Sequence, residues 1–193
     1  MPRNVRHEEP GAYYHVCSRG NDGRSIYIDE FDRWIFLELF TVVTRKHGWV
    51  VLSYCLMTNH YHVVLQIPDG GLSAGMHVLN GEFSRRTNCR HDRTGHLFRN
   101  RFYGEPIESE GHLLAACRYT VLNPCRAGLT ALPGEWRWSS YLASVGEINA
   151  PAFLAVGALH ELFGTRPSHA RAAYRRFVSD GHGLVSDTGF TSG

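Results

Sequence analysis

The sequence predicts an α+β fold: a ferredoxin-like split βαβ antiparallel sheet with helices on one face, an added helix and a C-terminal helical segment. Two observations predict it. The expected elements follow the order strand, helix, strand, strand, helix, strand. The chain has 193 residues, 43% of them hydrophobic, which is enough for one domain with a sizeable core. We expect this domain over residues 1–145, a helical extension over 146–180 and a disordered tail over 181–193.

The first half of the chain carries clear strand and helix signals. Residues 12–18 are rich in β-forming side chains and predict a first strand, followed by a glycine-containing turn. Asp29 is a suitable N-cap for a helix that should end near His47. Residues 50–66 form two apolar, β-branched runs around a polar turn, and therefore predict a hairpin.

The second half supplies the remaining elements. A helix is predicted from residue 72 to about 91, and a fourth strand over residues 96–103. A third helix begins after Ser109 and should end near Asn123, because a proline follows and disfavours helical geometry in the residue before it. This helix is an addition to the split βαβ pattern, so it can lie across the open face of the sheet.

His60 and His62 open the second strand of the hairpin. Side chains alternate along a strand, so both point to one face, about 6 to 7 Å apart. From that distance two neutral imidazoles can chelate a divalent cation, with a third ligand, expected to be an oxygen, from elsewhere. The same spacing can also arise by chance in a chain with 12 histidines.

The third helix presents a second polar face. His112, Ala116, Tyr119 and Asn123 are three or four residues apart, so they lie on one side of the helix. A tyrosine and an amide one turn apart therefore face the same way.

The histidine hairpin and this helix resemble the single-tyrosine HUH transposases and, in detail, the REP-associated tyrosine transposases. Five matching blocks occur in the same order, and together they extend roughly over residues 10–145. The blocks are residues 14–21, 57–62, 95–98, 119–129 and 136–141. The resemblance implies the same fold.

The resemblance also implies cleavage and rejoining of DNA strands at single-stranded, hairpin-forming repeats (REP elements), through a covalent 5′-phosphotyrosine. Tyr119 matches the nucleophile, and it alone among the tyrosines has an oxygen ligand candidate at i+4 on a helix. His60, His62 and Asn123 match the ligands of Mg²⁺ or Mn²⁺. A phenol oxygen leaves more easily than an alkoxide, so a strand's 3′-hydroxyl can reverse the phosphotyrosine bond.

Six further residues are candidates for DNA binding. Residues 85–101 contain six arginines and one aspartate, a local charge of +5 in a chain of net charge +2. If the fourth strand borders the histidine face, its arginines would line a groove for single-stranded DNA. Arginines at the end of the second helix could instead serve the helix dipole, and a lone histidine in the first strand could be structural. The candidates are His15, Arg19, Arg85, Arg86, Arg99 and Arg101.

Composition excludes several classes of protein. No run of eighteen apolar residues exists and the N-terminus lacks a signal-peptide pattern, so we expect a soluble cytoplasmic protein, nucleoid-associated when bound to DNA, with no membrane partner. Five cysteines without a Cys-x-x-Cys pair argue against a disulfide framework. We expect a monomer, with a dimer as the alternative. Two other functions stay open: a protein that binds such repeats without cutting, and a metal-dependent nuclease that uses water.

Overall fold

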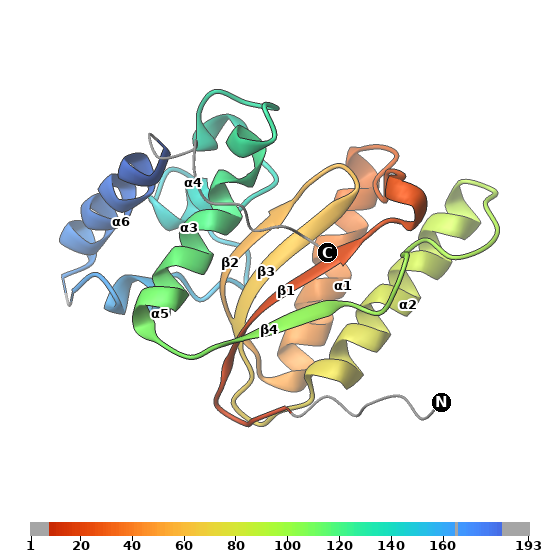
Figure 1. The fold of residues 1–193 in the computed structure, drawn as a ribbon, viewed down its shortest axis with the longest axis horizontal. Helices are drawn as coiled ribbons and strands as arrows, with labels where there is room; N and C mark the ends of the chain where they lie inside the picture. The colour runs from red at the N-terminus through yellow and green to blue at the C-terminus, as the bar shows by residue number, and fades with distance from the viewer. Residues whose placement is uncertain (1–7, 165, 183–193) are drawn as a thin grey trace.

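A computed structural model describes residues 8–164 and 166–182, which form a four-stranded antiparallel sheet between two layers of helices (Figure 1). The strand order is β2-β3-β1-β4, the order of a ferredoxin-like sheet, as predicted. The bounds of the strands are β1 (Tyr13–Arg19), β2 (Val50–Leu56), β3 (His60–Gln66) and β4 (Tyr103–Ile107).

One face of the sheet is covered by α1 (Glu30–His47) and α2 (Leu72–Arg90). The predicted start of α1 is confirmed, since the Asp29 side chain accepts a hydrogen bond from the Asp32 N–H in a capping box. Apolar residues from both helices and from the sheet form a continuous core on this face. Tyr61, which lies between the two histidines of β3, is fully buried in it.

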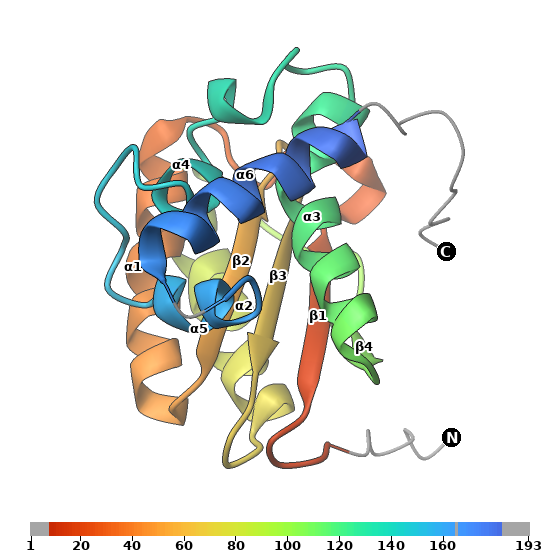
Figure 2. The ribbon, with the colours of Figure 1, turned by 90° about the vertical axis from the view of Figure 1, so that its left-hand side faces the viewer.

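The opposite face carries the C-terminal half of the chain (Figure 2). Its helices are α3 (Glu110–Arg126), α4 (Tyr141–Ser144), α5 (Val156–Glu161) and α6 (Pro167–His182), with a 3₁₀ turn at η2 (Pro133–Glu135). A second 3₁₀ turn, η1 (Asn21–Gly23), follows β1. Leu52 and Val64 of the sheet, Cys117 of α3 and Tyr174 of α6 share one core. The tail that we expect to be disordered lies, from residue 183 on, outside the described residues.

A β-bulge in β2 anchors α3 to the sheet. The β2–β3 register shifts between Val51 and Ser53, so Leu52 and Ser53 both face α3. Leu52 enters the apolar core there, and the Ser53 hydroxyl donates to the Cys117 carbonyl at 3.3 Å. The middle of α3 is thus held directly over β2 and β3.

The predicted end of α3 is wrong: the helix continues through Pro124 to Arg126. A proline in the last turn removes a single hydrogen bond, and later donors complete the turn. The Ala127 N–H donates to the Asn123 carbonyl and the Leu129 N–H to the Pro124 carbonyl, both at 2.9 Å. Asn123 therefore keeps helical geometry one turn beyond Tyr119.

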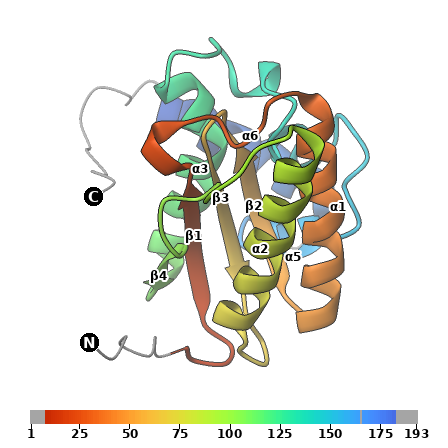
Figure 3. The ribbon, with the colours of Figure 1, turned by 90° about the vertical axis from the view of Figure 1, so that its right-hand side faces the viewer.

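The predicted fourth strand is also wrong, because β4 starts only at Tyr103. Leu97, Phe98 and Phe102 are buried and draw the preceding segment inward as a loop. This segment runs from α2 to the end of β1 (Figure 3), where the Arg99 N–H donates to the Arg19 carbonyl at 3.0 Å. Arg99 and Arg101 accordingly do not alternate on a strand beside the histidines.

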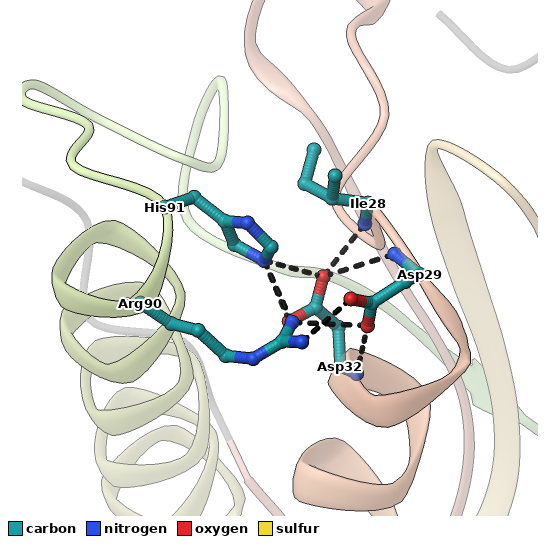
Figure 4. Close-up of polar contacts among 5 residues, drawn as sticks. All are labelled: Ile28, Asp29, Asp32, Arg90 and His91. Carbon is teal, nitrogen blue, oxygen red and sulfur yellow. Dashed lines mark hydrogen bonds and ion pairs between the residues drawn. The ribbon is translucent and has the colours of Figure 1, made fainter.

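A buried polar cluster joins the start of α1 to the end of α2; we call Asp29, Asp32, Arg90 and His91 the Asp32 cluster (Figure 4). Asp32 is fully buried. Its carboxylate accepts from Arg90 Nη1 at 2.8 Å, from His91 Nε2 at 3.0 Å and from the Ile28 N–H at 2.7 Å. Arg90 Nη2 also donates to Asp29 at 2.6 Å.

The structure bears on two expectations drawn from composition, one about membrane-spanning helices and one about disulfide bonds. Within residues 8–164 and 166–182 no helix has the length and apolar character needed to cross a bilayer. All five cysteines are free thiols, so the disulfide framework that composition argues against is absent from these positions.

Candidate active site

Three imidazoles gather on the α3 side of the sheet. His60 and His62 lie on β3 with their ring centroids 5.0 Å apart. His15 comes from the neighbouring strand β1, and its ring stacks on that of His62 at 5.1 Å. The alternation of side chains along β3 therefore delivers the predicted pair, and the pairing of β1 with β3 adds a third ring.

Tyr119 covers this group from α3. Its ring centroid lies 5.6 Å from that of His62 and 5.8 Å from that of His15, both edge to face. The side chain is half-buried, so the phenol is not sealed inside the protein. We call His15, His60, His62 and Tyr119 the histidine–tyrosine cluster.

The protonation of His60 follows from its partner. Its Nδ1 lies 2.7 Å from Asn59 Oδ1, and an amide oxygen can only accept, so Nδ1 carries the proton. Burial, and secondarily Arg19, lowers the pKa of His60 to about 4. The ring is neutral at pH 7 and keeps a lone pair on Nε2, the form that binds metal ions.

His62 is arranged in the same way. Its Nδ1 lies 3.0 Å from Nε2 of His15. In the tautomer in which His62 Nδ1 donates its proton to His15, Nε2 of His62 keeps its lone pair. Burial lowers the pKa of His62 well below its usual value and that of His15 to about 4. Each of the two predicted ligands thus has one nitrogen held by the protein, the arrangement typical of metal-bound histidines.

Asn123 is buried one turn beyond Tyr119. Its Nδ2 donates to the Tyr119 carbonyl at 3.0 Å. In the described part of the chain, no three His, Cys, Asp or Glu side chains converge as a metal site. Among the described side chains, the amide oxygen of Asn123 is a donor that Mg²⁺ and Mn²⁺ accept.

Arg126 also belongs to this site, although no spacing rule singled it out in the sequence. Its guanidinium lies over the Tyr119 ring, 5.0 Å from the centroid, and its buried Nε has no hydrogen-bond partner in residues 8–164 and 166–182. Burial raises the pKa of the Tyr119 phenol, while Arg126 and a hydrogen bond with Asn123 lower it. The sequence could have indicated Arg126 by its position, because it lies seven residues, or two helical turns, after Tyr119 and therefore on the same side of the helix.

Only one of the five candidate arginines lies beside the histidine–tyrosine cluster. Arg19 is exposed at the end of β1, paired in register with His60. Arg85 and Arg86 lie on α2, in the other helix layer, and both bind Glu82, at 2.7 Å and 2.9 Å. The remaining two, Arg99 and Arg101, lie in the loop that follows α2. His15 is buried at 8% exposure, so it acts on His62 rather than at the surface.

A ferredoxin-like sheet whose paired strand histidines face a tyrosine on an added helix defines the class of single-tyrosine HUH proteins. Within it, the chain belongs to the family of IS200-like transposases, whose model matches residues 9–121. The match includes His60, His62 and Tyr119, and it ends just before Asn123.

A solved structure of a REP-associated tyrosine transposase bound to a REP hairpin has the same fold. Its TM-score to this chain is 0.67 at 16% sequence identity, and the alignment covers 78% of this chain and 89% of the other. None of the curated proteins matches the chain.

Proposed function

We propose that this transposase cleaves and rejoins single-stranded DNA at hairpin-forming, REP-like repeats through a covalent 5′-phosphotyrosine on Tyr119, assisted by a divalent metal ion. The observation that carries the proposal is the histidine–tyrosine cluster. It joins two neutral imidazoles with free Nε2 atoms to a half-buried phenol.

His60 and His62 would hold Mg²⁺ or Mn²⁺, and Asn123 would contribute an amide oxygen. When bound, the cation polarises a non-bridging oxygen of the phosphate under attack. His15 is a positioning residue, because its hydrogen bond to His62 fixes the orientation of that ring.

Tyr119 is the nucleophile. Its hydroxyl oxygen forms a bond to phosphorus as the bond from phosphorus to the 3′-oxygen breaks; the phenolic proton is lost and the departing 3′-oxygen gains one. Arg126, over the same ring, would bind the phosphate as negative charge builds up, since its buried Nε has no hydrogen-bond partner among the described residues. Attack by a 3′-hydroxyl reverses the step and rejoins strands.

Hairpin DNA is the substrate that the comparisons favour. The similar transposase is bound to a REP hairpin, and membership of the IS200-like family points to DNA strand transfer. On this chain, exposed Arg19 stands next to His60 and would contact the phosphate backbone of the strand entering the site. We propose that the chain acts as a monomer.

The test uses labelled single-stranded hairpin DNA with Mn²⁺. We expect a covalent protein–DNA adduct in the wild type and its loss in Tyr119→Phe. Tyr103→Phe is the matched control, because Tyr103 is 60% exposed on β4 and should leave the adduct unchanged.

The same assay separates the two alternatives. Free 5′-phosphate products that persist in Tyr119→Phe would identify a nuclease that uses water. Bound but uncut hairpins in both proteins would identify a binding protein, and either result would overturn the proposal.

A further inference from the structure

A groove of about 870 Å³ lies between α2 and the segment that leads to β4. Both sides contribute polar residues to its rim, among them His77 and Ser84 from α2 and Arg99 and Arg101 from the loop. None of the described residues that line it is acidic. A basic rim of this kind favours an anionic ligand.

The two arginines of this groove differ from their neighbours on α2. Arg85 and Arg86 are paired with Glu82. The guanidinium groups of Arg99 and Arg101 are exposed, and within the described part of the chain they make no hydrogen bond or ion pair. Their charge is therefore available to a ligand.

The floor of the groove is apolar, formed by Met76, Leu97, Phe98 and Phe102. A duplex keeps its bases stacked inside and offers such a floor only sugar and phosphate. An unpaired base can lay its ring on an apolar surface while its phosphates meet the basic rim. We propose that this α2 groove binds unpaired nucleotides of the DNA substrate; the inference rests on the proposed function.

The groove is connected to the active site through the end of β1. The Arg99 N–H donates to the Arg19 carbonyl, and Arg19 pairs in register with His60. A single strand leaving the groove can thus pass around the end of β1 toward His60. The groove would hold a single-stranded flank of a hairpin while another part of the same strand enters the active site.

The first test removes charge from the rim. We compare binding of a blunt hairpin with binding of the same hairpin carrying a short single-stranded flank. The double variant Arg99→Ala/Arg101→Ala should bind the flanked hairpin at least about tenfold more weakly, with a salt slope smaller by about 2. The blunt hairpin should change less than about threefold. Arg45→Ala/Lys46→Ala removes two exposed charges from α1 and is the matched control.

The second test fills the groove and leaves its charge intact. Gly81 lines the groove on α2, and a Cβ there would meet no atom within 4 Å. Gly81→Leu should therefore fold normally and weaken binding of the flanked hairpin only. Gly157→Leu is the control, because Gly157 is also helical with open space around it but lies on α5.

The outcomes are distinct. Selective loss of the flanked hairpin in both groove variants supports the inference. Equal loss of both hairpins, or no loss of either, overturns it. At saturating DNA the groove variants should still form the Tyr119 adduct. If the wild type forms no adduct but the groove variants selectively lose binding of the flanked hairpin, the proposed function is overturned and the groove inference stands.

Discussion

The two faces of the sheet each hold a polar cluster with histidine, and the clusters differ in what they leave unsatisfied. In the Asp32 cluster, the buried carboxylate is matched by Arg90 and by three further donors. In the histidine–tyrosine cluster the imidazole rings are neutral. The hydrogen bonds of His60 and His62 involve their Nδ1 atoms and leave their Nε2 atoms for a ligand. A cluster whose buried charge is fully hydrogen-bonded has a structural role. Ring nitrogens with unused lone pairs beside a tyrosine hydroxyl can instead bind a ligand.

The largest expected effect is the loss of DNA cleavage when the histidine–tyrosine cluster is altered. His62→Ala should reduce cleavage at least about 10³-fold, because a bound metal ion contributes several kcal/mol to the transition state. Its free energy of unfolding should change far less. Adduct formation and thermal unfolding, measured on the same preparation, check both. A variant that cleaves normally would show that His62 holds no metal ion.

The second effect is a loss of stability when the Asp32 cluster is altered. Asp32→Ala should lower the free energy of unfolding by roughly 3 kcal/mol, since it strips a buried, multiply bonded carboxylate from Arg90. The melting temperature should fall by roughly 6 to 12 °C. Below that temperature the adduct should form at the wild-type rate. Glu38→Ala, an exposed acid on the same helix, is the control and should change stability by less than about 0.5 kcal/mol.

The third effect compares two arginines of α3, each of which stacks on an aromatic ring. The Arg118 guanidinium lies 4.3 Å from the Phe177 ring centroid and donates to the Phe177 carbonyl, whereas the buried Nε of Arg126 has no partner in the part of the chain that the structure describes. Arg126→Ala should slow cleavage about 10²-fold at saturating DNA. Arg118→Ala should affect only stability. Equal rates in single-turnover assays of the two variants would contradict a role for Arg126 at the phosphate.

The smallest effect concerns His15, which supports a ligand without being one. His15→Ala should weaken Mn²⁺ binding about tenfold, the low end of effects for residues that orient metal ligands. Titration followed by electron paramagnetic resonance measures this directly. High Mn²⁺ should restore cleavage in His15→Ala, and failure of that rescue would indicate that His15 acts elsewhere.

Much of the fold could be predicted from local sequence. Alternation in residues 50–66 defined the hairpin, and the placement of both histidines on one face followed from backbone geometry alone. The cap of α1 at Asp29 was also predicted from local sequence, and the ferredoxin-like sheet from the order of the elements. The two errors, the end of α3 and the start of β4, fall where packing overrode local preference. Pro124 stays helical in a buried last turn, and buried Phe98 and Phe102 pull the predicted strand into a loop.

The candidate active site likewise combines features that the sequence predicted and features that depend on packing. The sequence by itself determined the histidine pair and the Tyr119–Asn123 spacing, because the periods of strands and helices are properties of the backbone. Only the tertiary structure decided that His15 binds His62, 47 positions away, and that Arg126 stacks on Tyr119. It also separated Arg85 and Arg86, which both pair with Glu82, from the exposed guanidinium groups of Arg99 and Arg101 at the groove. Which side chains meet across the chain depends on strand pairing and packing, and no local pattern encodes these contacts.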